Sequence, residues 1–330
     1  MRAIQITGPG GPEVLKLTDL PAPEPAAGQV GVNATMIGVN FTDLFARIMA
    51  QDKPVVPGVE VVGTVASVGA DVSDVSVGQR VIAAPLYSLG GYAERVVADA
   101  SHVLPIPDGV SDEAAAAIAL NYGTAYAALH HCARIQPGET VVIHAAAGGV
   151  GTAAVQLARL VPDTFLIGTA SAAKHDYLRS QGVHETIDYR SGDWEAEIRA
   201  NHPDGVDLIL DGVGESGFAR SIGLLRFGGR VVGYGLAAIV PDDHTVPEID
   251  ATIAATTTLE PFLTNSTGFI GCHLGAPAPL FRQWISHLLT LCADGAITPH
   301  IDRVFPLAEA ADAHRYLHQR LNVGKLLLQP

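Results

Sequence analysis

One turn constrains the fold of this 330-residue chain more than any other feature of its sequence. The β-branched run Thr140–Ile143 is followed by segment 145–151, which reads AAAGGVG. A buried strand that turns through glycines into a helix lets a diphosphate approach the main chain, because no side chain obstructs it. The helix start then offers unpaired amide groups to the anion. The alternative is a turn that only packs tightly. We predict cofactor contacts at Ala147, Gly148, Gly149, Val150 and Gly151.

The turn lies within a repeated alternation of strand and helix signals. Strands are expected at 165–169, 206–211 and 229–234, and helices at 151–160 and 174–181. Gly182 then stands where a glycine ends a helix. Repeated strand–helix units require right-handed crossovers and produce a parallel sheet with helices on both faces. The sequence therefore predicts an α/β protein with a doubly wound, Rossmann-type domain at about residues 119–264.

The flanking segments have a different character. Residues 1–110 read as short β-strands, for example 29–34 and 59–68, separated by proline and glycine turns. This pattern favours a small barrel over a helical domain. At Ser111 the sequence changes to an N-capped helix start with acids in its first turn. The last residues carry two helix signals and a closing strand at 325–328, and this tail can pack back on the barrel.

Charge and cysteine content exclude several classes of function. A net charge of −14 argues against a nucleic-acid partner, which needs a basic face, but not against an anionic cofactor held by local cations. The three cysteines are odd in number and far apart, which suits a reducing compartment. No run approaches the ~18 apolar residues of a membrane helix, and no signal-peptide core is present. We expect a cytoplasmic protein without an integral membrane segment.

The end of the second strand indicates which dinucleotide binds. An NAD site usually carries an acid there for the ribose hydroxyls. Here the segment reads GTASAAK, with no acid but with Ser171 and Lys174, and Tyr189 follows a later strand at a place from which it can reach the same spot. Since the chain has only four lysines, we interpret Lys174 as a 2′-phosphate ligand; the alternative is a solvated lysine at a helix start. NADPH is the expected cofactor.

Metal binding is not predicted. The 13 histidines do not form a ligand cluster, and the adjacent His130 and His131 diverge by about 100° on a helix. His314 and His318 share one helix face, but with no neighbouring acid or cysteine we interpret that face as solvated.

Several segments together resemble one known family. The turn AAAGGVG, followed by GTASAAKH, IDY, VVGYG and NVGKLLL, resembles the zinc-free quinone oxidoreductase branch of the medium-chain dehydrogenases/reductases. GVNFTDL, PGVEVVGTVASVG and ITPHID are similar to its VAT subgroup of synaptic vesicle proteins. The resemblance covers essentially the whole chain. It implies a GroES-like β-barrel catalytic domain (1–118 and 265–330), a Rossmann NADPH-binding domain (119–264) and a homodimer formed by the cofactor-domain sheets near 268–272.

The same resemblance implies contacts to the cofactor from both domains. Besides the glycine turn, these residues are Asn40, Thr124, Ser171, Lys174, Tyr189, Tyr234, Gly235, Asn322 and Lys325. The segment between Phe45 and Pro57 is shorter than in the family, and since that loop usually borders the active site, the substrate's shape stays open.

The resemblance also implies how the reaction proceeds without metal. Zinc-dependent relatives place Cys where this chain has Asn40 and His where it has Val59, and neither residue can ligate zinc. A conjugated carbonyl, such as a quinone or enone, accepts hydride with little help because the charge delocalises onto oxygen. The candidate catalytic residues are Asn40, Asp43, Tyr87 and Tyr122. The tyrosines are equally expected as core residues, and Asp43 as a helix cap.

Two other classes of function stay open at this point. One is an NADPH-binding or lipid-associated protein with little turnover, suggested by the similarity to vesicle proteins. The other is a tailoring enzyme of a biosynthetic pathway that acts on one large unsaturated substrate.

Overall fold

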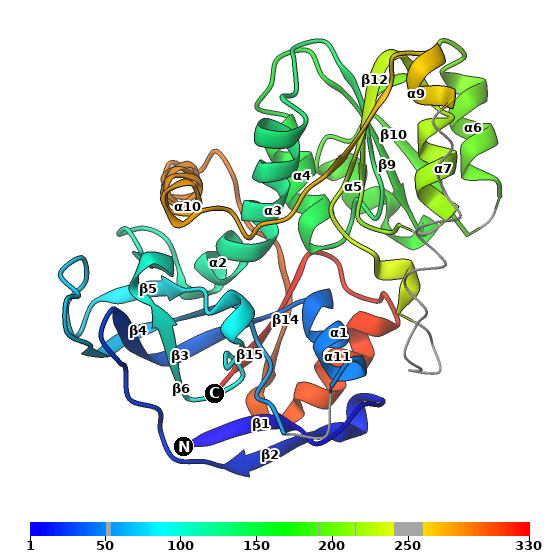
Figure 1. Cartoon of the computed structure of the whole chain (residues 1–330). Helices are drawn as coiled ribbons and strands as arrows, with labels where there is room; N and C mark the ends of the chain where they lie inside the picture. The colour runs from blue at the N-terminus through cyan, green and yellow to red at the C-terminus, as the bar shows by residue number, and fades with distance from the viewer. Residues whose placement is uncertain (51–53, 191, 215, 241–259) are drawn as a thin grey trace. The chain divides into compact units, whose positions relative to one another are not determined.

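The computed structural model describes all residues except 51–53, 191, 215 and 241–259. The chain divides into two compact units (Figure 1). The barrel unit contains Met1–Gly123 and Gly275–Pro330. The parallel-sheet unit contains residues 124–240 and 260–274 among those described. In the part of the chain that the structure describes, no helix has the length and apolarity needed to span a membrane.

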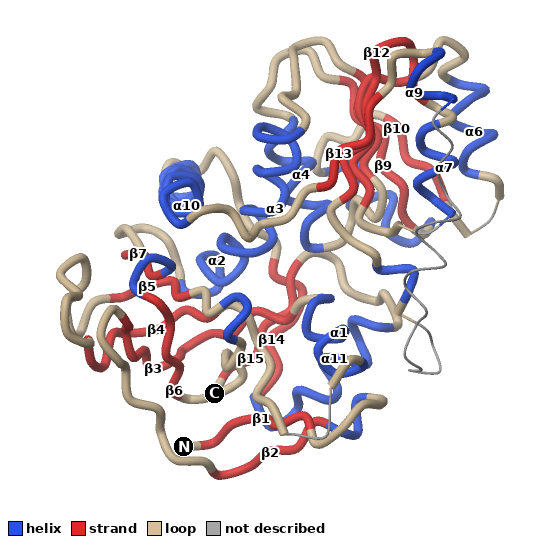
Figure 2. Tube along the Cα trace, viewed as in Figure 1, coloured by secondary structure: helices blue, strands red, loops and turns tan. Residues whose placement is uncertain are grey.

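Six strands form one sheet in the parallel-sheet unit, in the order β10-β9-β8-β11-β12-β13, and every neighbouring pair is parallel. The strands of this sheet are drawn in red, with helices beside them, in Figure 2. The strands are β8 (Thr140–Ile143), β9 (Phe165–Ala170), β10 (Glu185–Asp188), β11 (Val206–Asp211), β12 (Leu225–Gly233) and β13 (Gly268–Gly271). The chain moves outward from β8 to β10, then returns to the other side of β8 as β11. Ligands of doubly wound sheets bind at the carboxyl ends of the strands where the order reverses, here β8 and β11.

Helices cover both faces of this sheet, with α4 on one side and α6 and α7 on the other (Figure 1). They are α4 (Gly149–Ala158), α5 (His175–Ser180), α6 (Trp194–Asn201), α7 (Ser216–Ile222) and α9 (Glu260–Thr264). Ile198 of α6 and Ile222 of α7 pack on Val142 and Ile209 of the central strands, which forms the core of that face. The alternation of strands and helices is confirmed. Gly182, at φ +86°, follows the cap of α5 as predicted.

The barrel unit contains a second sheet, in the order β14-β15-β3-β4-β5-β7, with β6 also paired to β3. Its strands are β3 (Gln29–Val39), β4 (Val61–Val68), β5 (Arg80–Ala83), β6 (Arg95–Asp99), β7 (Val103–Pro105), β14 (Ile301–Pro306) and β15 (Lys325–Gln329). A separate antiparallel pair consists of β1 (Arg2–Ile6) and β2 (Leu15–Asp19). The tail does pack back on the barrel, since β15 pairs antiparallel with β3, with Leu327 opposite Gly38.

The helices of the barrel unit come from both of its segments, Met1–Gly123 and Gly275–Pro330. They are α1 (Phe41–Ile48), α2 (Asp112–Ala117), α10 (Ala278–Ala293) and α11 (Ala310–His318). Ser111 caps α2 as predicted, since its hydroxyl accepts a hydrogen bond from the Ala114 amide. After α2 the chain continues through η4 (Ile118–Tyr122), α3 (Gly123–Tyr126) and η5 (Ala127–Cys132). Single-turn 3-10 segments complete the fold: η1 (Pro12–Val14), η2 (Leu86–Ser88), η3 (Ala100–His102), η6 (Ala172–Lys174), η7 (Ala237–Ile239) and η8 (Leu307–Glu309).

The interpretation of the His314 and His318 face as solvated is wrong for His314. His314 is fully buried and contacts the Tyr92 hydroxyl through Nε2, at 3.1 Å. The hydroxyl of Tyr92 in turn contacts the buried carboxyl of Asp43. Sequence spacing could not show this acid, because Asp43 is brought to α11 only by the packing of α1 against it.

We expect the tail strand to be necessary for the stability of the barrel unit. Leu327→Ala should lower the free energy of unfolding by about 2–5 kcal/mol, because it empties a fully buried site. Urea denaturation measures this change. Leu321→Ala, at a side chain that is 50% exposed just before β15, is the matched control and should change the value by less than about 0.5 kcal/mol. Equal losses in the two variants would contradict the role assigned to β15.

Candidate functional site

The glycine-rich turn connects β8 to α4 and is shaped by a close contact between the helix and the turn. A Cβ built at residue 151 would lie 2.3 Å from the Ala145 carbonyl oxygen and 2.6 Å from the Ala146 Cα. Only glycine fits there. Gly148 is the N-cap residue of α4, and a Cβ on it would approach the same carbonyl oxygen to 3.2 Å. The turn therefore lies directly against the first turn of the helix.

The start of α4 offers amide groups to an anion. The first intrahelical hydrogen bond runs from the Thr152 amide to the Gly148 carbonyl at 2.8 Å, so the preceding amides have no acceptor within the helix. Among the described residues, no side chain caps this helix. Ala147 is buried and Val150 is half-buried, and neither side chain carries a polar group. The turn, at the carboxyl end of β8, can thus bind a diphosphate through its backbone.

The predicted 2′-phosphate residues come together at the neighbouring strand ends. Ala170 of β9 pairs with Asp188 of β10, so Ser171 and Tyr189, which follow them, occupy adjacent positions. Lys174 ends the 3-10 turn that Ser171 begins, and its amide donates to the Ser171 carbonyl at 2.9 Å.

Sequence reasoning missed a cation at this place. The Arg190 guanidinium lies 5.6 Å from the centre of the Tyr189 ring, and its Nε donates to the Tyr189 hydroxyl at 3.3 Å. A basic residue next to a predicted ligand was the signal that could have found it.

The loops that follow β11 and β12 meet on the side of β8 that faces away from β9. The Asp211 carboxylate accepts hydrogen bonds from the amides of Val213 and Gly214, at 2.8 and 2.9 Å. The Tyr234 amide donates to the Asp211 carbonyl at 2.9 Å, and the Tyr234 ring leaves no space for a Cβ on residue 212. Burial raises the pKa of the Tyr234 hydroxyl well above its ordinary value, so this group stays protonated. Gly235 packs as tightly, since a Cβ there would lie 2.7 Å from the Gly212 carbonyl oxygen.

Asn40 and Lys325 belong to a buried cluster in the barrel unit. The Lys325 ammonium forms an ion pair with Glu60 and donates to the Asn40 side-chain oxygen at 2.6 Å. The Asn40 amide donates to Glu60 at 3.0 Å, and the Leu120 backbone amide donates to the other Glu60 oxygen at 2.8 Å. Lys325 and Glu60 are only 2% and 1% exposed. Asn121 lies next to Asn40, with the two side chains 3.5 Å apart. No sequence pattern pointed to Glu60 or Asn121.

Asp43 belongs to a second group of buried, hydrogen-bonded side chains in the same unit. Its carboxylate accepts from the Asn40 backbone amide at 2.8 Å and forms a capping box at the start of α1. The Tyr92 hydroxyl donates to the same oxygen at 3.1 Å. Burial raises the pKa of Asp43 to about 7, against the lowering effect of the Asn40 hydrogen bond. The expectation that Asp43 caps this helix is confirmed.

The remaining predicted residues occupy separate places. Asn322 is buried and donates to the Gly324 carbonyl at 2.8 Å. Tyr122 is buried in η4, and Thr124 is a half-buried residue of α3. Tyr87 lies in η2, but its side chain is outside the described residues. The shortened segment after Phe45 includes residues 51–53, which are also outside them.

Two family descriptions match the chain. One, "Alcohol dehydrogenase GroES-like domain", matches residues 26–108, and the other, "Zinc-binding dehydrogenase", matches residues 181–328. The barrel unit thus has the GroES-like fold and the parallel-sheet unit the Rossmann fold, which confirms the predicted fold class.

Individual relatives match over nearly the whole chain. The human synaptic vesicle membrane protein VAT-1 homolog is 39% identical over 346 residues, covering 100% of this chain and 86% of the relative. Quinone oxidoreductase-like protein 2 of Bos taurus is 34% identical over 91% of this chain and 84% of its own length. The crystal structure of Escherichia coli quinone oxidoreductase complexed with NADPH has a TM-score of 0.89 at 28% identity, with 100% of both chains covered. The chain therefore belongs to the medium-chain dehydrogenase/reductase superfamily, together with the VAT-1 homologues and the quinone oxidoreductases.

Proposed function

We propose that this oxidoreductase uses NADPH to reduce a conjugated carbonyl, such as a quinone or enone, without zinc. The observation that carries the proposal is the glycine-rich turn at the reversal of strand order, beside a strand end that has no acid. Bound NADPH would supply the hydride.

The parallel-sheet unit suits a dinucleotide because of the space left by Gly148 and Gly151. A Cβ at either position would approach the Ala145 carbonyl oxygen, so glycine lets the turn pack directly against the start of α4. We propose that the amides of Gly149, Val150 and Gly151 bind the diphosphate. The E. coli relative that was solved with NADPH supports a dinucleotide as the ligand.

The preference for NADPH over NADH depends on the strand ends of β9 and β10. Ser171 and Tyr189 occupy adjacent positions there. We propose that Ser171, Lys174 and Tyr189 bind the 2′-phosphate, and that Arg190 adds a second cation. A cation and hydroxyl groups favour a phosphate at a place where an acid would select the ribose hydroxyls of NAD.

The residues of the barrel unit do not fit a catalytic zinc ion. Zinc sites in proteins use thiolate, imidazole or carboxylate ligands. At the Asn40 cluster the acid is Glu60, and its charge is already compensated by the Lys325 ammonium. A zinc ion bound there would have to displace that ammonium or lie against it. Across the described parts of the chain, no three His, Cys, Asp or Glu side chains are grouped as a metal site.

The hydrogen bonds within the barrel cluster limit what Asn40 can contribute to the reaction. The amide hydrogens of Asn40 are directed to Glu60 and the Gly38 carbonyl, and its oxygen accepts from Lys325. We therefore propose that Asn40 acts as an orienting residue near the nicotinamide rather than as a donor to the substrate carbonyl. We propose that Tyr122 or solvent returns the proton. Tyr87 is the alternative proton donor, and Asp43 acts through the cap of α1.

The second candidate function is a nucleotide-binding protein with little turnover. The relatives named synaptic vesicle membrane protein VAT-1 homolog favour it. Steady NADPH oxidation with simple quinones or enones would support the reductase, and binding without turnover would support this alternative. A tailoring enzyme would turn over only a large unsaturated substrate.

We keep a homodimer and a cytoplasmic location as parts of the proposal, to be tested by light scattering and cell fractionation.

Lys174→Ala should raise the Kd for NADPH roughly 10- to 100-fold, the effect of a lost hydrogen bond to a charged group, and leave the Kd for NADH nearly unchanged. Fluorescence titration with both nucleotides measures the two constants. Lys16→Ala, at an exposed lysine of β2, is the matched control and should change neither. Equal effects of Lys174→Ala on NADPH and NADH would remove the 2′-phosphate assignment.

Purified protein should contain well below one zinc per chain, and chelators should leave NADPH oxidation unchanged. Elemental analysis by mass spectrometry together with an activity assay tests this. This is expected because the Glu60 carboxylate is already paired with the Lys325 ammonium at the place where a zinc ion would need ligands. A stoichiometric zinc content that chelators remove together with activity would overturn the zinc-independent mechanism.

A further inference from the structure

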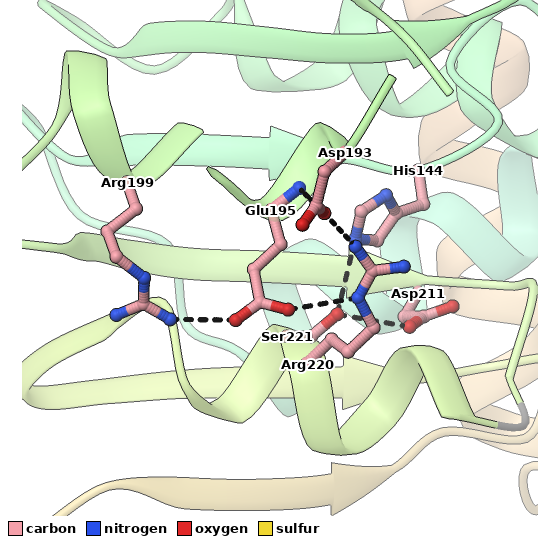
Figure 3. Close-up of polar contacts among 7 residues, drawn as sticks. All are labelled: His144, Asp193, Glu195, Arg199, Asp211, Arg220 and Ser221. Carbon is pink, nitrogen blue, oxygen red and sulfur yellow. Dashed lines mark hydrogen bonds and ion pairs between the residues drawn. The ribbon is translucent and has the colours of Figure 1, made fainter. Parts of the chain in front are cut away.

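A chain of buried polar side chains crosses the carboxyl ends of three neighbouring strands in the parallel-sheet unit. His144 follows β8, Thr169 lies near the end of β9, and Asp211 ends β11. His144 Nδ1 lies 3.1 Å from the Thr169 hydroxyl, and His144 Nε2 lies 3.2 Å from the Ser221 hydroxyl of α7. The Ser221 hydroxyl donates to Asp211 Oδ2 at 3.3 Å. Figure 3 shows Ser221 between His144 and Asp211.

The direction of each hydrogen bond in this chain follows from the carboxylate end. Asp211 accepts only, so the single hydroxyl hydrogen of Ser221 is directed to it. Ser221 must then accept from His144, and the ring therefore carries its hydrogen on Nε2. His144 Nδ1 is left as an acceptor for the hydroxyl hydrogen of Thr169. The Thr169 oxygen in turn accepts from the Ala145 backbone amide at 3.3 Å. One neutral tautomer of His144 thus satisfies every member of the chain.

Both ends of the chain terminate on backbone amides of loops that the proposed function assigns to the cofactor. At one end, Thr169 holds the glycine-rich turn through the Ala145 amide on its hydroxyl and the Ala146 amide on its carbonyl. At the other end, Asp211 holds the loop after β11 through the amides of Val213 and Gly214. The two loops flank the reversal of strand order between β8 and β11.

The surroundings keep His144 neutral and away from water. The Trp194 ring lies edge-on to the imidazole, with 4.7 Å between centres, and the Arg220 guanidinium lies 4.2 Å from the centre of the Trp194 ring. Arg220 is held by ion pairs with Asp193 and Glu195 (Figure 3). Burial lowers the pKa of His144. The Asp211 carboxylate acts against this lowering, and the Arg220 guanidinium adds to it.

The same three residue types occur in hydrolases, but this order excludes that chemistry. In a nucleophilic triad the histidine lies between serine and acid, so that it can take the serine proton. Here Ser221 lies between His144 and Asp211 and gives its hydrogen to the carboxylate. The Ser221 side chain is also fully buried. The arrangement can therefore hold backbone in place but cannot attack a substrate.

We propose that His144 is a positioning residue that joins the glycine-rich turn and the loop after β11 into one preorganised cradle for the dinucleotide. The inference rests on the proposed function, since it names the groups that shape the same site. Preorganised amides bind a ligand more tightly because less ordering is required on binding.

Three substitutions of His144 separate the two arms of this hydrogen-bonded network, which are the link to Thr169 and the link to Ser221. Leu removes both arms and fills the space. Asn keeps an acceptor near the position of Nδ1, so it should retain the link to Thr169 only. Gln carries a donor near the position of Nε2, so it should retain the link to Ser221 only. Hydrogen exchange of the ligand-free protein, followed by mass spectrometry, reports on the two loops, and titration gives the Kd for NADPH.

His144→Leu should speed exchange of the amides at 145–146 and 213–214 about tenfold and raise the Kd for NADPH about tenfold, the effect of one lost buried hydrogen bond. Asn should restore protection at 145–146 only, and Gln at 213–214 only. His202→Leu is the matched control, because His202 contacts Glu185 at the amino end of β10. It should lower the Tm and leave both loops and the Kd unchanged.

The outcomes separate this inference from the proposed function. A wild-type protein that binds no NADPH would reject the proposed function, while exchange in the two loops would still decide the role of His144. If His144→Leu lowers the Tm as His202→Leu does but changes neither loop nor Kd, His144 is only a core residue and the inference fails. Should His144→Leu not fold, Thr169→Val and Ser221→Ala test the two arms in the same way.

Discussion

Helix α4 can lie against the end of β8 only because residue 151 has no side chain. Any Cβ there would overlap the Ala145 carbonyl and the Ala146 backbone. Ala145 itself adopts φ +51°, a left-handed conformation that costs a non-glycine residue about 1–3 kcal/mol. The Thr169 hydroxyl and carbonyl hold the amides of Ala145 and Ala146 and so help to maintain this conformation. The result is a backbone surface at the place where the strand order reverses.

The barrel unit depends on a different constraint, which is a buried charge pair. Lys325 and Glu60 are almost fully buried, and such a pair persists only when hydrogen bonds satisfy the remaining polar atoms. Asn40 and the Leu120 amide provide those bonds. Because Lys325 comes from the last strand, the pair ties the C-terminal tail to the barrel. The proposed zinc independence rests on the same pair.

The fold alone does not decide what the protein does. Relatives of similar identity carry the names of a vesicle protein and of a quinone oxidoreductase. A shared fold hosts many activities, so function has to be argued from the groups at the site. Here those groups are backbone amides, hydroxyls and cations in one unit and a neutralised cluster in the other. They support nucleotide binding more directly than they identify a substrate.

The sequence by itself determined the central strands, helices α4 and α5 of the parallel-sheet unit and the glycine turn, because these depend on residues close together along the chain. The strand before Gly148, the cap at Ser111 and the glycine after α5 are all local signals. The absence of an acid within segment 168–174 could also be read without coordinates. Tertiary structure decided which distant side chains meet. His144 reaches Ser221, Lys325 reaches Glu60, and His314 reaches Tyr92 across 77, 265 and 222 positions. No periodicity carries such pairings, since they arise only when separate strands and helices pack together.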